Sequence, residues 1–414
     1  MRFLFPISIL LWVFPNPLPA QPGCTDPQAS NYDPNASGND GSCVYPATNY
    51  SLAVKTSLST ALKESSGLVW AGGSLWTHND TGDGPYLYKI DTLTNAILQT
   101  VTIGGATNVD WEDIAFDGTN FYAGDFGNNA NGNRTDLKIY KFPLSAIPAG
   151  DDVTVPADQV QVINFSYEDQ TNFTPQGSNN TSFDCEAMLY RNGELHLFTK
   201  DWVNLHTSHY TLPTAAGTYT AVKRESFFAN GLVTGADITP QGVIVLLGYA
   251  AAGGPNFLWL LFDYPPGVFF GGNKRRIDLG SWLLAGQTEG ICFRNSASGY
   301  VSNEQVSVIV PARLYCFDLS QWLQPVFLPA VTPPATDHTP CGVVPNPLPA
   351  GRPLSLQPLP LENTQLIIWD IWGRLVWQGG YDPSEQPAFS AGWYALQVRS
   401  PEGAVQCAAS FFVW

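Results

Sequence analysis

Residues 110–129 read DWEDIAFDGTNFYAGDFGNN and contain a structural unit that this chain repeats. An acidic segment precedes an apolar run, a turn containing Asp117 and Gly118 follows, and a second apolar run comes next. LKIYKFP at residues 137–143 supplies a third run, which carries Tyr140. Short apolar and aromatic runs separated by turn residues are typical of β-strands. The segment therefore predicts three successive strands joined by turns.

The chain contains five copies of this unit. The other four copies are ESSGLVWAGGSLWTHND from Glu64, DCEAMLYRNGELHLFTKDW from Asp184, TGADITPQGVIVLLGYA from Thr234 and QTEGICFRNSASGYVSNEQ from Gln287. Their starts are about 50 residues apart, which is the spacing of four-stranded propeller blades. One interval is longer because it contains the polar residues 166–183.

The last copy lacks a strand, and NYSLAVKTSLST at residues 49–60 is a strand without a blade. Pairing the two would close the ring and remove exposed sheet edges. We therefore predict an all-β fold, a five-bladed β-propeller over residues 49–324. Six blades are the alternative if residues 49–61 belong to a further blade, and a sandwich with long connections is a third arrangement.

Composition agrees with this fold class and excludes some partners. The 414 residues include 38 Gly and 33 Pro, and 13% are charged and 13% aromatic, which favours a turn-rich β protein. The formal net charge is -16, from 35 acidic against 19 basic residues. That charge repels phosphate backbones and anionic membranes, so nucleic-acid binding is not expected.

The N-terminus predicts export. Residues 1–20 have one early Arg2, an apolar stretch and a Pro-rich end at Ala20, as in a secretory signal peptide. A membrane anchor is the alternative, but the stretch is shorter than the roughly 20 residues that span a bilayer. No other segment predicts a transmembrane span. We expect a protein that is secreted or on the outer-membrane surface after signal-peptide cleavage.

Residues 21–48 form a predicted disulfide-stapled module. Cys24 and Cys43 enclose a segment with few apolar residues, which needs a covalent link to hold a shape. Among the other cysteines, Cys292 with Cys316 and Cys341 with Cys407 are candidate pairs, and Cys185 is left over.

Inside this module the spacing of oxygen-bearing side chains predicts either a calcium loop or simple Asx turns. The candidate ligands are Asp33, Asn35 and Asp40. The segment GCTDPQASNYDPNASGNDGSC at residues 23–43 resembles a Cys-bracketed module of secreted Bacteroidota proteins.

The C-terminal part has a Pro-rich linker at residues 325–342 and a domain at residues 343–414, predicted as a small Ig-like β-sandwich. VVPNPLP, WDIWGRLV and FSAGWYALQV resemble the C-terminal sorting domain of type IX secretion. The resemblance implies that the type IX secretion machinery is a partner; an unrelated Ig-like binding module is the alternative. The motif residues are Pro345, Asn346, Pro347, Asp370, Gly373, Arg374, Gly392 and Tyr394.

The repeats predict a ring of acids. The first strand of each blade lines the channel of a propeller, so equivalent residues surround its axis. Such a ring demands a cation, with calcium or magnesium as the simplest choice, unless the acids cap backbone N–H groups instead. Glu112 and Glu186 are also the catalytic candidates. The predicted ring consists of Glu64, Glu112, Glu186, Asp237 and Glu289.

Two loops should rise on the same face as this ring, THNDTGDG from residue 77 and GDFGNNANGNR from residue 124. They are dense in oxygen ligands and contain cations that could hold an anion, which predicts a site for a phosphate or a sugar. Ordinary hairpin turns are the alternative. The candidate ligand-binding residues are His78, Asn79, Asp80, Asp125, Asn128, Arg134 and Lys200.

The order ESSGL, WEDIA, EAM and TEGI resembles, distantly, the calcium-activated nucleotidase (apyrase) family and the phytase-like propellers. This resemblance implies a calcium ion in the channel and hydrolysis of phosphoanhydride or phosphoester bonds. Our hypothesis is a propeller that binds a divalent cation and recognises or hydrolyses a small polar ligand. The alternative is a non-catalytic surface interaction or adhesion protein.

Overall fold

The structure is a computed structural model that describes residues 21–306, 310–323, 342–343, 348–349, 352, 354–357, 365–370, 375–380, 389, 392–399 and 405–413. The chain divides into two compact units, Met1–Val326 and Phe327–Trp414. The predicted signal peptide lies outside the described residues, as do Cys341 and nearly all of the linker. The same holds for Pro345, Asn346, Pro347, Gly373 and Arg374.

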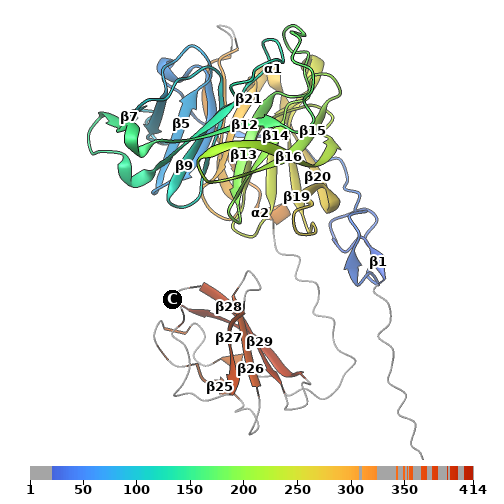
Figure 1. The fold of residues 1–414 in the computed structure, drawn as a ribbon. Helices are drawn as coiled ribbons and strands as arrows, with labels where there is room; N and C mark the ends of the chain where they lie inside the picture. Colours follow the sequence, from blue (N-terminus) through green and yellow to red (C-terminus); the bar gives the residue numbers. More distant parts are fainter. Residues whose placement is uncertain are drawn as a thin grey trace, which may run out of the picture. The chain divides into compact units, whose positions relative to one another are not determined.

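Twenty of the described strands of the first unit pair antiparallel in five sheets of four strands, and Figure 1 labels members of successive sheets from blue β5 through green β13 and yellow β19 to β21. Sheet one contains β4 (Ser65–Ala71), β5 (Ser74–Asn79), β6 (Tyr86–Ile90) and β7 (Ile97–Ile103); sheet two contains β8 (Trp111–Phe116), β9 (Asn120–Asp125), β10 (Lys138–Pro143) and β12 (Gln161–Tyr167); sheet three contains β13 (Cys185–Arg191), β14 (Glu194–Thr199), β15 (His206–Pro213) and β16 (Gly217–Phe228). Sheet four contains β17 (Leu232–Ile238), β18 (Ile244–Tyr249), β19 (Pro255–Phe262) and β20 (Asn273–Ser281), and sheet five contains β21 (Thr288–Phe293), β22 (Ser298–Asn303), β23 (Arg313–Asp318) and β3 (Ala53–Ser57).

The five sheets form a closed ring. Their first strands touch in the cycle β4, β8, β13, β17, β21 and back to β4. Strand β3 comes from the N-terminal side of the repeats and pairs with β23, with Ser57 opposite Arg313, as the sequence predicts. Sheets arranged radially around one channel, each starting at its centre, define a β-propeller. The prediction of an all-β propeller is therefore confirmed.

Apolar residues fill the spaces between neighbouring sheets. One buried cluster lies between each pair of adjacent sheets, and Trp76, Trp111 and Phe121 form the centre of the one between sheets one and two. Trp76 and Phe121 meet edge to face at 5.6 Å between ring centroids, a favoured aromatic geometry. Inner strands such as β8, β9, β18 and β21 are buried on both faces, which explains their continuous apolar runs, whereas outer strands such as β16 alternate between buried and exposed residues.

Additional pairings cover the outer edges. Strand β11 (Asp152–Val155) runs parallel to β7, and β12 runs parallel to β16, so sheets two and three are joined edge to edge. The described helices are short: α1 (Trp282–Ala285), α2 (Ser320–Leu323), η1 (Thr60–Leu62), η2 (Leu144–Ala146), η3 (Ala157–Gln159), η4 (Ala251–Gly253) and η5 (Phe269–Gly271). Among the described residues, no helix is long and apolar enough to span a membrane.

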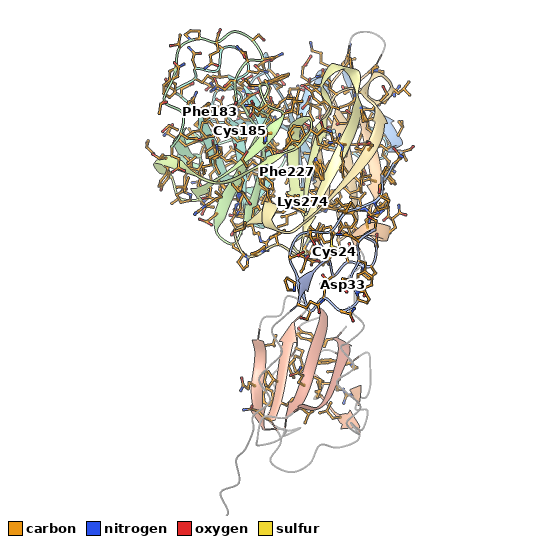
Figure 2. The ribbon with its side chains drawn as sticks, turned by 90° about the vertical axis from the view of Figure 1, so that its right-hand side faces the viewer. Cys24, Asp33, Phe183, Cys185, Phe227 and Lys274 are labelled. Carbon is orange, nitrogen blue, oxygen red and sulfur yellow. A yellow bond between two sulfur atoms is a disulfide. The ribbon has the colours of Figure 1, made fainter. Side chains whose placement is uncertain are left out.

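The predicted Cys24–Cys43 disulfide is present in the N-terminal module, which also contains the short strands β1 (Pro22–Gly23) and β2 (Gly38–Asn39). Figure 2 shows Cys24 and Asp33 in this module. Arg275 of β20 anchors it, because its guanidinium lies over the Tyr45 ring at 5.1 Å and donates to the Gln28 side chain. The module therefore packs on sheet four.

The suggested Cys292–Cys316 disulfide is wrong. Cys292 of β21 and Cys316 of β23 both lie opposite Tyr300 of the intervening β22. Two strand spacings separate them by about 10 Å, too far for a disulfide. Both are free thiols, and so is Cys185, which Figure 2 shows inside the first unit.

The second unit is also built from strands. The described ones are β24 (Gly342–Val343), β25 (Leu356–Gln357), β26 (Gln365–Asp370), β27 (Leu375–Gly380), β28 (Gly392–Arg399) and β29 (Val405–Val413). The last four form an antiparallel sheet in the order β27, β26, β28, β29. Tyr394, one of the motif residues, is buried in its core and stacks on Phe411 at 5.3 Å. Gly392 begins β28, and Asp370 ends β26.

The disulfide predicts how the N-terminal module responds to mutation. Replacing Cys24 and Cys43 together by Ser should destabilise the module by about 3 kcal/mol, because the open loop gains chain entropy. Limited proteolysis should then cut within residues 21–48 much faster, while the propeller melts almost as before. Cys316→Ser, which removes a free thiol, is the control and should leave cleavage unchanged. Equal protection of the double variant would contradict the stapling role.

Candidate cation site at the channel mouth

Each first strand begins with an irregular register at the same place. The pairing with the second strand shifts next to residues 66, 112, 186, 234 and 289. The equivalent residues in the five sheets are therefore Ser66, Glu112, Glu186, Thr234 and Glu289. Three buried carboxyl groups and two hydroxyl groups form the ring at this end of the channel.

The two hydroxyl groups connect neighbouring sheets. Ser66 donates to the carbonyl of Glu112 at 2.6 Å, and Thr234 donates to the carbonyl of Thr288 at 2.7 Å. These bonds fix the first strands of sheets one and four to the strands that follow them. The strands that carry Glu112 and Glu289 are thereby held against their neighbours at the channel mouth.

The structure does not bring Glu64 and Asp237 into this ring. Glu64 precedes β4 and forms a partly exposed ion pair with Lys63 at 3.6 Å. Asp237 lies three residues beyond Thr234 and accepts backbone N–H groups of Ile238 and Phe293 at 2.7 and 2.6 Å. Asp237 therefore caps backbone donors deeper in the channel, and burial raises its pKa to about 7. The sequence alignment of the repeats misplaced both residues because it could not register the strand irregularities.

A cavity of about 180 Å³ opens at the ring. Asp80 and Glu304 reach it from the loops that follow β5 and β22, because second strands end where first strands begin in an antiparallel sheet. Glu304 and Asp110 were not predicted, although Asn303 and Glu304 stand at the end of the second strand of their repeat in the same way as Asn79 and Asp80. The cavity is lined by Asp80, Glu112, Asn129, Asn179, Glu186, Lys200, Trp202, Tyr249, Gln287, Glu289 and Glu304.

Asp80, Asp110 and Glu112 form a tight group at one side of the ring. Each offers a carboxylate oxygen, and these oxygens lie within 4.8 Å of one another. Asp80 Oδ1 and Glu112 Oε1 are buried without a hydrogen-bond partner. A Cβ atom on Gly127 would lie 2.2 Å from Glu112 Oε1 and 2.5 Å from Asp110 Oδ2, so only glycine leaves room for both carboxyl groups.

Burial and mutual repulsion disfavour the charged forms of these acids. The pKa of Glu112 is raised well above its ordinary value by burial first and then by Asp80 and Glu186. Burial and Asp110 raise the pKa of Asp80 to about 7, and burial and Asp184 raise that of Asp110 to about 6. A cation in their midst would remove this penalty.

Lys200 is the one cationic side chain among the described residues that line the cavity. It is buried and pairs with Glu186 Oε2 at 3.1 Å. Its ammonium lies over the rings of Trp202 and Tyr249 at 4.9 and 5.3 Å. Burial alone would lower the pKa of Lys200, but Glu186 and the other nearby acids raise it well above its ordinary value.

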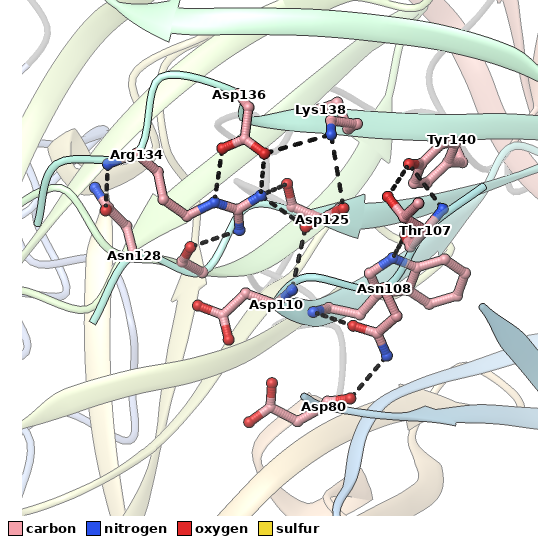
Figure 3. A network of polar contacts seen from close by, with 12 residues as sticks. Asp80, Thr107, Asn108, Asp110, Asp125, Asn128, Arg134, Asp136, Lys138 and Tyr140 are labelled. Carbon is pink, nitrogen blue, oxygen red and sulfur yellow. Dashed lines mark hydrogen bonds and ion pairs between the residues drawn. The ribbon is translucent and has the colours of Figure 1, made fainter. Parts of the chain in front are cut away.

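Arg134 supports the site from behind. Its guanidinium donates to Asp125 at 2.8 Å, Asp136 at 3.0 Å and the Gly127 carbonyl at 2.8 Å, as Figure 3 shows for the two acids. The backbone N–H of Arg134 donates to Asn128 Oδ1. Arg134, Asp125 and Asn128 therefore hold the loop that contains Gly127.

His78 and Asn79 are supporting residues too. His78 is fully buried beside Trp111 with ring centroids 5.5 Å apart, and burial lowers its pKa to about 4. Asn79 donates to the Ala61 carbonyl and to Asp83. Of the predicted ligand-binding residues, Asp80 and Lys200 line the cavity, and the others stabilise the segments around it.

The N-terminal module has the geometry of Asx turns. Asp33 Oδ1 accepts the backbone N–H of Asn35, and Asp40 Oδ1 accepts that of Ser42, each at 2.9 Å. Within the described residues, Asp80, Asp110 and Glu112 are the one group of three or more acidic, His or Cys side chains that converge. The module therefore does not gather Asp33 and Asp40 into such a group.

The fold and the cavity define a β-propeller protein with an acidic channel mouth. No family model matches the chain. A stretch of 28 residues, 7% of this chain, is 68% identical to ribulose bisphosphate carboxylase/oxygenase activase 1 of Larrea tridentata and 64% identical to the activase of Spinacia oleracea. The chain spans about 6% of the length of these curated relatives, so the match assigns no family.

Solved structures resemble the chain only weakly. PorZ, a surface component of the type IX secretion system of Porphyromonas gingivalis, is 13% identical over 84% of this chain and 45% of its own, with a TM-score of 0.30. Regucalcin, a calcium-binding protein of Agrobacterium tumefaciens, is 10% identical over 66% of this chain and 96% of its own, with a TM-score of 0.36. We transfer no activity, metal or partner from proteins this distant.

The buried ion pair makes a prediction about stability. Lys200→Met should destabilise the fold by about 3–5 kcal/mol at a pH where the Glu186 carboxyl group is ionised, because the substitution removes the buried counter-ion of that carboxylate. Glu186 already has a raised pKa, so the folded state binds a proton that the unfolded state releases above about pH 4.5, and stability falls as pH rises. Removing Lys200 raises that pKa further. Denaturant unfolding should therefore show that Lys200→Met lowers the free energy of unfolding, relative to the unsubstituted chain, by more at pH 8 than at pH 5.

Lys223→Met is the matched control. Lys223 pairs with Asp169 at 2.8 Å, but both side chains are 35% exposed, so the change should cost less than about 1 kcal/mol at either pH. An equal effect of the two substitutions, or no pH dependence for Lys200→Met, would contradict the role of Lys200 as counter-ion.

Proposed function

We propose that this chain is a five-bladed propeller that binds one divalent cation, calcium, at its channel mouth and there recognises a small polar ligand. The observation that carries the proposal is the pair of buried oxygens without a partner, Asp80 Oδ1 and Glu112 Oε1, beside Asp110. Buried carboxylates without a counter-ion are costly, so such an arrangement is expected where a cation binds.

The donor set fits a hard cation. Asp80, Asp110 and Glu112 offer carboxylate oxygens, which calcium and magnesium prefer, and no thiol or imidazole lines the cavity among the described residues. Calcium takes six to eight oxygens in flexible geometry, and the amide groups of Asn129 and Gln287 line the same cavity. When bound, the cation would supply positive charge for polarising an oxygen of the ligand.

Glu186 would give the site its capacity for proton transfer if the ligand is hydrolysed. It lies outside the converging group, lines the cavity and is held by Lys200. Glu112, the other catalytic candidate from the sequence, would act as a cation ligand in this proposal. The ligand would meet the cation on one side and the Glu186–Lys200 pair on the other.

We further propose that the protein reaches the cell exterior by type IX secretion. The signal-peptide pattern of residues 1–20 and the motif residues of the C-terminal unit support this route. The buried Tyr394 and the four-stranded sheet are compatible with the Ig-like sorting domain that the motifs resemble.

Calcium binding has a direct test in the purified full chain. Adding a chelator should lower the melting temperature by several degrees, since a cation at 100 times its Kd adds about 2.7 kcal/mol of stability. Asp80→Asn and Glu112→Gln should abolish this calcium-dependent shift. Without calcium they should melt no lower than the unsubstituted chain, because they remove repulsion.

Glu64→Gln is the control, since Glu64 is an acid that directly precedes β4 and lies outside the group formed by Asp80, Asp110 and Glu112. It should keep the full calcium-dependent shift. A melting temperature that changes neither on addition of calcium nor on addition of chelator would refute the cation site.

The export route is tested by deleting residues 343–414 in a host with a type IX secretion system. The truncated protein should accumulate in the periplasm, whereas the full chain reaches the surface or the medium. Cell fractionation with antibody detection measures the distribution. Normal surface delivery of the truncated protein would rule out the sorting role.

A further inference from the structure

A second cavity adjoins the acidic one. Its volume is about 540 Å³, and it shares Asn179, Trp202, Tyr249 and Gln287 with the acidic cavity. Beyond these, its wall includes Trp282 of α1. The two cavities therefore lie side by side and share these four residues, with carboxyl groups lining one cavity and aromatic rings lining the other.

The second cavity is neutral and aromatic. No charged side chain is among the described residues that line it. Two tryptophans and a tyrosine supply flat surfaces, and Asn179 and Gln287 supply amide donors and acceptors. Trp202 has a fixed orientation, because its indole N–H donates to Asp184 Oδ2 at 2.7 Å. We call this cavity the aromatic groove.

We infer that the aromatic groove holds a sugar ring of a neutral saccharide, with hydroxyl groups that extend to the cation site. This inference rests on the proposed cation site for its second contact. The apolar C–H face of a sugar ring packs on aromatic side chains, and its hydroxyl groups bond to amides, carboxylates and a bound cation. The aromatic groove offers the rings and the amide groups, and the adjoining acidic cavity offers the carboxylates and the proposed cation.

The charged groups in and around the acidic cavity disfavour the binding of phosphate esters. Lys200, the cation of the acidic cavity, is already paired with Glu186. The guanidinium of Arg134 is engaged by Asp125 and Asp136. A phosphate group would face carboxyl groups on several sides with one bound cation to offset them, so a neutral ligand is favoured.

Binding to the purified full chain tests this inference. Isothermal titration in calcium would use cellotriose, maltotriose, xylotriose and acetylated chitotriose as neutral probes, and pyrophosphate, ADP and spermidine as charged probes. At least one neutral saccharide should bind. Trp282→Ala should weaken that binding by about tenfold, the loss expected for one aromatic contact, without changing calcium affinity.

Leu284→Ala is the matched control, because Leu284 belongs to the same short helix but is 77% exposed and does not line the groove. It should leave both affinities unchanged. Calcium binding without binding of any neutral probe would overturn this inference and leave the proposed function standing. Binding of a charged probe alone, sensitive to Trp282→Ala, would also overturn it.

A separate outcome concerns the proposed function itself. If calcium does not bind, the cation site fails. Saccharide binding that is still sensitive to Trp282→Ala would then support the aromatic groove on its own.

Discussion

The pairing of β3 with β23 is the interaction on which the rest of this structure depends. It joins residues more than 250 positions apart in the chain and closes five sheets into a ring. Without that closure the first strands would not surround a common channel, and the glutamates of β8, β13 and β21 would not face one another. The apolar clusters between neighbouring sheets then fix the distance of each first strand from the axis.

Closure also creates an electrostatic cost. Glu112, Glu186 and Glu289 are buried at one channel mouth with Asp80 and Glu304 nearby, and Lys200 is the one basic side chain described there. Part of the cost is offset by the Lys200–Glu186 pair, and part by raised pKa values. The rest of this cost falls on the buried oxygens of Asp80 and Glu112 that lack hydrogen-bond partners. For this reason we place the cation on their side of the ring.

The candidate site was predictable in part. Glu112, Glu186 and Glu289 could be found because each precedes an apolar run in its repeat. Glu64 and Asp237 were predicted to occupy the ring position or to lie within one residue of it. The structure places Ser66 and Thr234 there instead, because a local shift in strand register changes which residue faces the channel. Arg134 looked suited to binding an anion, yet Asp125 and Asp136 occupy its guanidinium. Asp110 was not predicted, because its carboxyl group fits into the site only beside Gly127, which is close in space but lies seventeen positions later in the chain.

The amino-acid sequence by itself determined the all-β repeat, the partner strand that closes it and the Cys24–Cys43 link, because these depend on local patterns and short loops. Tertiary structure alone decided which acids converge, which cations are already paired, and that Cys292 and Cys316 are separated by a strand. The physical reason is that strand register and side-chain contacts between sheets set these distances. Residues far apart in the chain make those contacts, and their spacing in the sequence does not encode them.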